Sequence, residues 1–385
     1  MTSFPVRSVI VAIVGAICVI IGYVIDPART AAAYLIAYGA ALAAVLGAFA
    51  FVMIARVTAA NWFVALRRQA EQIMAVLPAF AVLLVPILVS YRILYRWAQP
   101  GTLEDASTRA ILQGKAGYLN LPFFVIRAIV YFAVWIFIAE LLRRASLEQD
   151  RGDSERIDRR MYVTSAVGLV AFAFTITFAA IDWFMSLAPT WYSTVYGVMY
   201  FAGGMVGGVA LITLLVARAR HRGELPEDIG ADHFHALAKL LLTFVLFWVY
   251  IGFSQLIVIW SAQIPAERGW YALRMRGGWR VLGGIMLLGH FALPFCALVV
   301  RAIKRSTLAM TMIAVLLLCM HYLDVYWIAM PDAPFHGGWG YVVDAGALLF
   351  ITGVASATWA VRRRGEAEVP VSDPRLPASL QYSTD

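Results

Sequence analysis

The stretch Asp182–Gly197, DWFMSLAPTWYSTVYG, separates two apolar runs that are each long enough to cross a lipid bilayer. It opens with an acidic residue, reaches Pro189 seven residues later, and then carries several hydroxyl groups before the second run begins. A helix needs about 20 apolar residues to span the bilayer core, where the backbone must satisfy its own hydrogen bonds. The stretch therefore indicates a short polar turn between two membrane-spanning helices.

Long apolar runs of this kind recur along the whole chain. Hydrophobic residues make up 62% of the 385 residues and charged residues only 14%, against roughly 25% charged in soluble domains. The first run exceeds the usual apolar core of a signal peptide, so we interpret it as a span. The fold class is thus predicted to be an all-α polytopic membrane protein with about ten transmembrane helices, near residues 8–25, 32–55, 74–95, 118–142, 162–186, 192–217, 235–262, 279–301, 307–330 and 340–361.

The positive charges favour one side of the predicted membrane. Most lysine and arginine residues fall at the termini and in the loops on the same side as the termini, which predicts cytoplasmic termini in a bacterial inner membrane. The net charge of +8 therefore needs no nucleic acid partner. The charged loop 143–160 is expected to be a solvated helical extension, and the tail after Arg364 to be disordered or to lie on a partner.

Two motifs suggest an internal duplication. Asp182 precedes Pro189 by the same spacing that separates Asp324 from Pro331, and each pair ends a predicted helix before a short outer turn. An offset of four helices preserves orientation and predicts a parallel repeat. We therefore expect a peripheral helix at 1–31, four-helix bundles at 32–190 (helices 2–5) and 191–331 (helices 6–9), a peripheral helix at 332–362 and a tail at 363–385.

The segment His321–Trp327, HYLDVYW, holds the most specific pair of polar residues in a predicted span. His321 and Asp324 are three residues apart and share one helical face. Ionisable residues within the membrane are costly and need a partner or a function. An imidazole beside a carboxylate can accept and pass on protons, as quinol oxidation requires. Alternatively, the pair is structural and fastens its helix to Arg127 or Gln255.

Asp182 allows three interpretations, because it lies only four residues from the end of its run. It could face the membrane interface or cap the turn toward Ser186, it could carry protons in the outer half of the membrane, or it could pair with Arg127. At the opposite ends of other helices, Glu140, Lys239 and His235 are candidates for an inner half-path.

Metal and haem sites have little support. The three cysteines, Cys18, Cys296 and Cys319, lie singly in apolar runs without metal-ligand spacing. His290 and His321 fall at matched depth on consecutive antiparallel helices and could in principle face one haem. The other histidines lie in loops or at helix ends, so we expect no metal and no haem in this chain.

Small residues, prolines and tryptophans add three further expectations. The glycines of Phe201–Ala210, FAGGMVGGVA, predict close helix packing. Pro78, Pro86 and Pro294 predict helix kinks. Eight tryptophans fall at the outer helix ends, which fits an interface belt or a face that docks another protein. They are Trp97, Trp183, Trp191, Trp260, Trp270, Trp279, Trp327 and Trp339.

Four segments resemble one family. They are YLNLPFFVIRAIVYFAVW (118–135), DWFMSLAPTWYSTVYG (182–197), KLLLTFVLFWVYIGFSQLIVIWSAQIPAE (239–267) and HYLDVYWIAMP (321–331). The chain resembles the F subunit of bacterial alternative complex III, a quinol:cytochrome c oxidoreductase, within the NrfD/polysulfide-reductase membrane superfamily. The departure is at 235–239, HALAK, where the family pattern is His-Asp-Leu-Gly-Lys; the missing acid weakens an inner proton entry there, and Lys239 with Glu140 could replace it.

The resemblance implies two four-helix bundles with two outer helices and no redox cofactor held by the chain. It implies partners as well: a homologous C-type membrane subunit, a periplasmic iron–sulfur subunit and subunits with haem c, together with lipid and quinone. On this basis we expect a subunit that is not catalytic alone and that contributes either a proton path or a quinol pocket to a respiratory complex, and we favour the proton path. The site candidates are Arg127, Asp182, Gln255, His290, His321, Asp324, Glu140, Lys239 and His235.

Two other function classes stay as alternatives. In a structural scaffold, the polar residues would only lock helices together and anchor the outer redox subunits. A secondary transporter would suit the parallel repeat and the kinks, but no pair of discontinuous helices is evident in the sequence.

Overall fold

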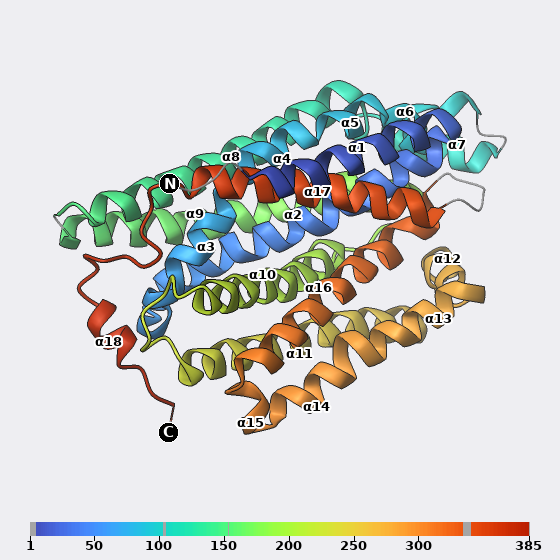
Figure 1. The fold of residues 1–385 in the computed structure, drawn as a ribbon. Helices are drawn as coiled ribbons and strands as arrows, with labels where there is room; N and C mark the ends of the chain where they lie inside the picture. The colour runs from blue at the N-terminus through green and yellow to red at the C-terminus, as the bar shows by residue number, and fades with distance from the viewer. Residues whose placement is uncertain (1–4, 103–104, 153, 334–339, 385) are drawn as a thin grey trace.

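The computed structural model describes residues 5–102, 105–152, 154–333 and 340–384, and this part of the chain is helical and without strands (Figure 1). Ten of its helical segments are long and apolar enough to cross a bilayer, and they overlap the ten predicted runs. The all-α polytopic membrane fold is therefore confirmed. The ten segments are Val6–Ile25, Pro27–Val57, Asn61–Val89, Leu121–Gln149, Glu155–Leu187, Tyr196–His221, Ala231–Ala262, Gly277–Val299, Thr307–Asp332 and Gly340–Arg362.

Several spans consist of more than one helical element. The α-helices are α1 (Val6–Ile25), α2 (Pro27–Val57), α3 (Arg67–Met74), α4 (Leu77–Leu83), α5 (Val85–Val89), α6 (Tyr91–Leu94), α7 (Ala106–Lys115), α8 (Leu121–Gln149), α9 (Ser154–Trp183), α10 (Tyr196–His221), α11 (Ala231–Ala262), α12 (Pro265–Arg274), α13 (Gly277–Met286), α14 (Leu293–Val299), α15 (Arg301–Lys304), α16 (Thr307–Ala329), α17 (Gly340–Arg362) and α18 (Leu376–Leu380). The 3₁₀ turns are η1 (Asn61–Leu66), η2 (Arg96–Ala98), η3 (Pro100–Thr102), η4 (Met185–Leu187) and η6 (Met330–Asp332), and η5 (Leu287–Ala292) is π-helical.

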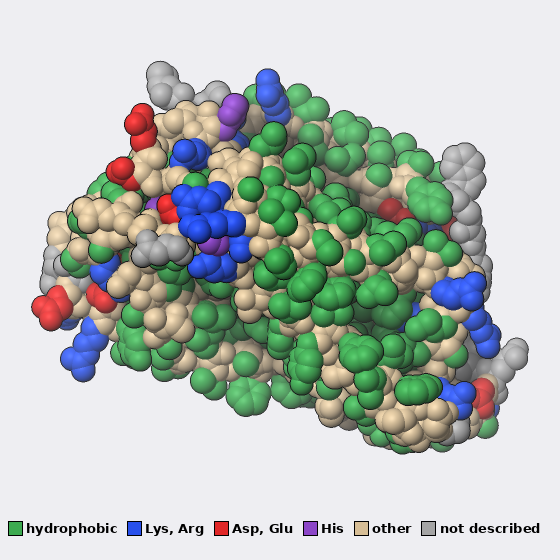
Figure 2. Space-filling view, turned by 90° about the horizontal axis from the view of Figure 1, so that it is seen from below, with side chains coloured by type: hydrophobic (Ala, Val, Ile, Leu, Met, Phe, Trp, Pro, Cys, Tyr) green, Lys and Arg blue, Asp and Glu red, His purple; other side chains and the backbone are tan. Residues whose placement is uncertain are grey.

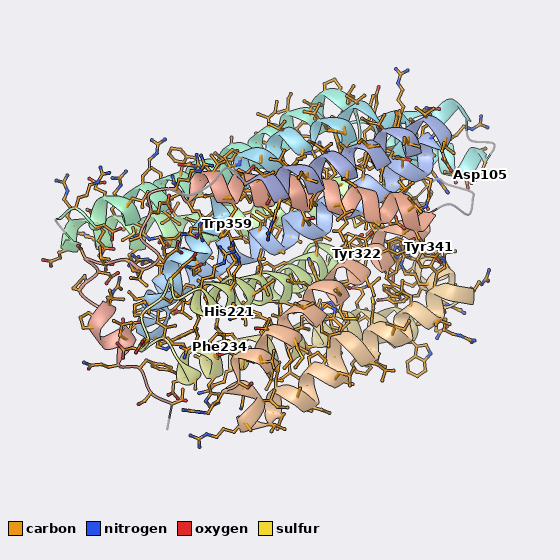
Figure 3. The ribbon with its side chains drawn as sticks, in the orientation of Figure 1. Asp105, His221, Phe234, Tyr322, Tyr341 and Trp359 are labelled. Atoms are coloured by element: carbon orange, nitrogen blue, oxygen red, sulfur yellow. The ribbon has the colours of Figure 1, made fainter. Side chains whose placement is uncertain are left out.

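The long helices lie side by side along one direction, with both chain ends at the same end of the stack (Figure 1). We call this the terminal end. The short helices α7 and α12 lie at the opposite end. The side chains of His221 and Phe234 lie toward the terminal end, whereas Asp105 and Tyr341 lie near the other (Figure 3).

Helix α2 is at the centre of the stack. Its side chains are mostly apolar on every face, and almost all of them are buried, as expected for a helix surrounded by others. It contacts α1, α9, α10, α16 and α17. A Cβ added at Gly47 would lie 1.9 Å from the carbonyl oxygen of Gly204 on α10. The predicted close packing of the Phe201–Ala210 glycines is thus confirmed, and its partner is α2.

Prolines stand at the start of new helical elements in the third span. In the eighth span, a proline follows a π-helical turn. Pro78 and Pro86 each begin a new helical element, α4 and α5, because proline lacks a backbone donor and does not fit a helix interior. Pro294 follows the π-helical turn η5 at the start of α14. A helical element therefore begins or changes type near each of the three prolines.

The contacts within each half match the neighbours expected in a four-helix bundle. Helix α9 contacts α2 and α8, and α8 contacts α4; in the second half, α10 contacts α11 and α16. However, α2 and α10 also pack extensively on each other. The division into two bundles at residue 190 therefore stays a prediction.

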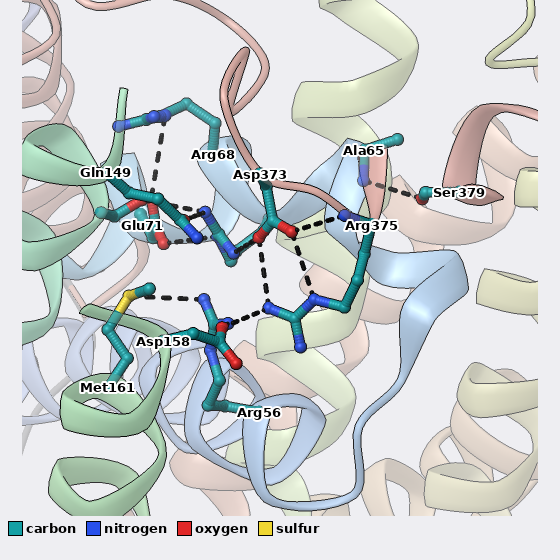
Figure 4. Close-up of polar contacts among 12 residues, drawn as sticks. Arg56, Ala65, Arg68, Glu71, Gln149, Asp158, Met161, Asp373, Arg375 and Ser379 are labelled. Carbon is teal, nitrogen blue, oxygen red and sulfur yellow. Dashed lines mark hydrogen bonds and ion pairs between the residues drawn. The ribbon is translucent and has the colours of Figure 1, made fainter. Parts of the chain in front are cut away.

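The chain tail is built into the terminal end, so the expectation that it is disordered or lies on a partner is wrong. Asp373 is buried and accepts a hydrogen bond from Arg67 at 2.6 Å. Ser379 is also buried, and its hydroxyl accepts a hydrogen bond from the Ala65 amide (Figure 4). The same hydroxyl donates to the Trp62 carbonyl. The tail satisfies buried charges and backbone groups of the helices, which is why it is ordered.

The tail completes an ion-pair cluster that we call the terminal-end network. Asp158 on α9 pairs with Arg56 on α2 and with Arg375 of the tail, and Arg375 also pairs with Asp373 (Figure 4). Its members are Arg56, Arg67, Arg68, Glu71, Asp150, Asp158, Asp373 and Arg375. The predicted helical extension of loop 143–160 is confirmed, since α8 reaches Gln149 and α9 begins at Ser154.

Candidate functional site

His321 and Asp324 lie on α16 and both face the glycines of α10. A Cβ added at Gly203 would lie 2.7 Å from Oδ2 of Asp324 and 3.3 Å from Nδ1 of His321. A Cβ at Gly207 would lie 2.8 Å from Cδ2 of the His321 ring. The α10 glycines therefore have a second role besides the contact with α2. They let two ionisable side chains pack directly on the α10 backbone.

Asp324 is buried inside the second half of the molecule and has a neutral hydrogen-bond donor. It is 5% exposed, and the indole N–H of Trp248 on α11 donates to its Oδ2 at 3.1 Å. Within the described part of the chain, Asp324 forms no ion pair with a lysine or an arginine. Asp324 lies five residues before the end of α16, about 8 Å along the helix. Asp324 is thus a carboxyl group with no fixed counter-charge among the residues that the structure describes.

His290 completes the site from the π-helical turn η5. Its imidazole stacks on the Trp248 ring, with the ring centroids 4.1 Å apart, and it is fully buried. Neither ring nitrogen of His290 has a hydrogen-bond partner among the described residues. A π-turn often marks a functional position in a helix, and buried polar groups normally have partners. Both observations indicate that His290 serves more than packing.

One ring nitrogen of His321 has a hydrogen-bond partner, and the other has none among the described residues. Its Nε2 lies 3.1 Å from the carbonyl oxygen of Ala40 on α2, so Nε2 carries the proton of that hydrogen bond in the neutral ring. Its Nδ1, on the Asp324 side, has no partner among the described residues. We call His290, His321, Asp324 and Trp248 the α16 site. This site brings together three titratable side chains and contains no lysine or arginine.

Arg127 and Asp182 form a second buried cluster of a different kind. The Nε and NH2 groups of Arg127 donate to the two carboxylate oxygens of Asp182 at 2.7 and 2.9 Å. Tyr131 donates to the same carboxylate at 2.7 Å, and the guanidinium stacks on Tyr118. Of the three interpretations of Asp182, the ion pair with Arg127 is therefore confirmed. Ser186 hydrogen-bonds the backbone oxygen of Asp182, and not its carboxylate.

The alternative partners proposed for His321 and Asp324 are engaged elsewhere. Arg127 belongs to the Asp182 pair, and Gln255 accepts a hydrogen bond from Ser193 at 3.0 Å. Gln255 therefore fastens α11 to the turn before α10. A structural pairing of the His321–Asp324 segment with Arg127 or Gln255 is wrong.

The three inner candidates do not form one cluster. Glu140 on α8 pairs with Arg362 on α17 and lies near Arg144. Lys239 is exposed on α11. His235 is buried, and its Nδ1 lies 2.8 Å from the hydroxyl of Thr384 in the tail. The idea that Lys239 and Glu140 together replace a missing acid is therefore wrong, because Glu140 pairs with Arg362 on α17 and with arginines of its own helix.

Sequence reasoning missed several residues that the structure brings into play. Trp248 was one of many aromatic residues in apolar runs, with no local signal to distinguish it. Arg29 and Asp344 form a buried ion pair at 2.5 Å between α2 and α17. The polar residues of α3 were assigned to a loop, although Arg67, Arg68 and Glu71 are buried. Arg67 and Arg68 pair with the nearby Glu71, but their other partners, Asp373 and Asp150, are far away in sequence.

The outer tryptophans pack largely within the chain. Trp191 stacks on Trp270 with centroids 4.6 Å apart, and the Arg274 guanidinium lies 3.4 Å from the centroid of the Trp270 ring. Trp97 and Trp183 are also buried, whereas Trp260 is exposed. The predicted Trp339 lies outside the described residues. Most of the bias thus reflects an internal aromatic cluster, and not an open docking face.

A bridging haem does not suit the geometry of His290 and His321. One ring stacks on Trp248, and the other is held against α10 and bonded to Ala40. No group of three or more metal-ligating side chains occurs within residues 5–102, 105–152, 154–333 and 340–384. The three cysteines are free thiols.

Comparison of the chain with models of known protein families finds no match, and comparison with curated proteins finds none either.

Proposed function

We propose that this chain is a membrane subunit that moves protons through the α16 site during quinol oxidation by a respiratory complex. His321, Asp324 and His290 are the groups that bind and release the proton. Trp248 positions Asp324 and His290 relative to each other. The chain is not catalytic alone in this proposal, and the redox cofactors, haem c and iron–sulfur clusters, belong to partner subunits.

One observation carries the proposal: Asp324 is buried in a spanning helix beside imidazoles and has no fixed counter-charge in the described structure. In such surroundings the charged carboxylate costs free energy, whereas the protonated carboxyl group is uncharged and avoids that cost. In this proposal, small changes around Asp324 therefore make its carboxyl group release or take up a proton. The free Nδ1 of His321 and both nitrogens of His290 supply the groups that give or receive that proton.

The Arg127–Asp182 pair supports the same assignment by contrast. Both carboxylate oxygens of Asp182 accept hydrogen bonds from the Arg127 guanidinium, so this carboxylate has a fixed counter-charge that Asp324 lacks among the described residues. Tyr131 adds a third donor to that carboxylate. We therefore remove Arg127 and Asp182 from the proton path and assign them to helix fastening. Gln255 has the same structural role, while Glu140, Lys239 and His235 do not extend the path as one cluster.

The respiratory context rests on the resemblance to the alternative complex III F subunit. It is tested by affinity purification of the full chain from its native membranes in a mild detergent. The proposal expects a homologous membrane subunit, c-type haem and iron–sulfur protein in the same particle, together with quinol:cytochrome c oxidoreductase activity. A chain that purifies alone, with no haem absorbance, would contradict this context.

A structural scaffold is the second candidate, and the terminal-end network favours it. This network joins α2, α3, α8, α9 and the tail through charged pairs that leave little freedom to move. If the chain is only a scaffold, substitutions in the α16 site will weaken assembly, and the complexes that do assemble will keep their full proton yield.

A further inference from the structure

A cluster of basic side chains lies on the face that Figure 2 shows, near the terminal end. We call it the basic patch and define it as Lys239, Arg301, Lys304 and Arg305. Lys239 lies on α11, and the other three lie on α15 or just after it, where α11 and α15 are in contact. All four positive charges act on His235 of α11. The patch is thus one surface, although its members come from two segments of the chain.

The tail holds two members of the patch together. Thr384 contacts Arg301 through its backbone oxygen, Arg305 through its hydroxyl at 3.5 Å, and His235 through the same hydroxyl. Lys239 follows His235 by four residues and therefore projects from the same helical face. The geometry of the patch is built in and does not depend on chance side-chain positions.

Only one of the four basic side chains of the patch has a carboxylate partner among the described residues. In the terminal-end network, each guanidinium has a carboxylate partner within the structure, as Arg67 has Asp373 and Arg68 has Asp150. In the patch, Arg305 pairs with Asp232 at 2.5 Å. Within the described part of the chain, Lys239, Arg301 and Lys304 form no ion pair. Three positive charges of the patch therefore have no carboxylate partner among the described residues.

Exposed apolar side chains adjoin these charges. Val299 and Val300 immediately precede Arg301, and Leu308 follows the patch at the start of α16; all three are exposed. They belong to, or border, spans that end at the patch. A molecule that fits this surface needs a negative head and an apolar body. An acidic soluble protein offers the first feature but not the second.

We propose that the basic patch binds the phosphate headgroup of an anionic phospholipid, whose acyl chains lie along the exposed apolar side chains of α14 and α16. Basic side chains at the end of membrane spans bind such headgroups, with about 1 kcal/mol for each charge. That figure corresponds to roughly a fivefold change in affinity per charge. The lipid then bridges the α11 and α15 segments beside the tail.

The test measures lipid binding to the full chain purified in detergent. Native mass spectrometry records the affinity for phosphatidylglycerol and, in parallel, for phosphatidylcholine. The variant Lys239→Gln/Arg301→Gln/Lys304→Gln is expected to lose at least tenfold in affinity for phosphatidylglycerol, with no change for phosphatidylcholine. The matched control Arg268→Gln/Arg276→Gln/Arg280→Gln removes three exposed charges elsewhere on the chain and should bind like the unmodified chain.

A variant that keeps the three charges distinguishes loss of charge from misfolding of the chain. Lys239→Arg/Arg301→Lys/Lys304→Arg keeps the three charges. Its affinity for phosphatidylglycerol should stay within about threefold of that of the unmodified chain, since a point charge suffices for this contact. Equal loss in the patch and control variants would overturn the proposal, as would equal affinity of the unmodified chain for the two lipids. Full displacement of the lipid by millimolar inorganic phosphate would also overturn it, because the occupant would then be a small soluble anion.

Discussion

Trp248 donates its indole N–H to Asp324 at 3.1 Å while its ring stacks on His290 at a centroid distance of 4.1 Å. One side chain on α11 thus connects a carboxyl group on α16 with an imidazole in a π-helical turn. None of these three residues is close to another in sequence. The proposed proton-handling role depends on this contact, because it places two titratable groups around one neutral donor.

Loss of the Trp248 donor should destabilise the α16 site. In Trp248→Phe, an aromatic ring remains to stack on His290, but Asp324 loses the hydrogen bond. A buried polar group without its partner costs about 1–3 kcal/mol. Thermal unfolding of the purified chain should reveal a lower midpoint. The control Trp260→Phe changes an exposed ring and should stay within about 0.5 kcal/mol of the original; equal effects of the two changes would contradict the assignment.

Gly203 should not accept a larger side chain. Its added Cβ would meet Asp324 Oδ2 at 2.7 Å, so Gly203→Ala must displace the carboxylate or separate α10 from α16. Overpacking of this kind costs about 1–3 kcal/mol. Gly284→Ala is the matched control, because nothing lies within 4 Å of its added Cβ and alanine favours a helix. The midpoint of thermal unfolding should fall for the first variant and stay equal or rise for the second.

The Arg127–Asp182 pair should behave as a fastener. Arg127→Met leaves the carboxylate of Asp182 buried with only Tyr131 as a side-chain donor, which should cost about 3–5 kcal/mol. The double variant Arg127→Met/Asp182→Leu removes both charges and should recover much of that loss. A double variant that is as unstable as the single one would show that the pair does not act as a unit. Unfolding midpoints of the three chains provide the measurement.

The docking of the tail should depend on the charge of Asp373. Burial alone raises the pKa of this carboxyl, but the hydrogen bond from Arg375 and the charge of Arg67 outweigh burial and lower the pKa to about 2. Because the folded pKa is below the unfolded value of about 4, the stabilisation is present above pH 4 and is lost as the pH falls through 2.

Asp373→Asn removes that stabilisation at neutral pH. Trypsin should then cleave at Arg375 several-fold faster than in the unmodified chain, since the tail leaves the α3 surface more often. Ser372→Asn is a suitable control, because Ser372 is exposed and its hydroxyl donates a hydrogen bond to the backbone oxygen of Asp150, and not to a charged side chain. Equal cleavage rates in the Asp373 and Ser372 variants would show that the ion pairs do not hold the tail.

Hydropathy was sufficient to predict the membrane fold, because each span must be apolar over its own length. It also identified Asp182, His321 and Asp324, since charge within an apolar run is rare. It could not rank the partners of these residues. Asp182 and Arg127 are 55 residues apart, and Asp324 and Trp248 are 76 residues apart. Both pairings depend on how the helices pack, which hydropathy does not show.

The sequence misled where local polarity and burial disagree. The segment Arg67–Gln72 reads as a loop, but the tail and α8 supply its partners, so it is buried. The same reason explains the tail itself, which is polar enough to appear disordered by composition. Glu140 and Lys239 appeared equivalent by depth, yet they lie in different halves of the molecule.

The most direct measurement of the central claim is the proton-to-electron ratio during quinol oxidation by the purified complex in sealed vesicles. Asp324→Asn keeps the size of the side chain and removes its capacity to exchange a proton. The account predicts a lower ratio in Asp324→Asn with electron transfer retained, and an unchanged ratio in Asp182→Asn for the complexes that remain assembled. An unchanged ratio in Asp324→Asn, with the complex intact and active, would contradict the account.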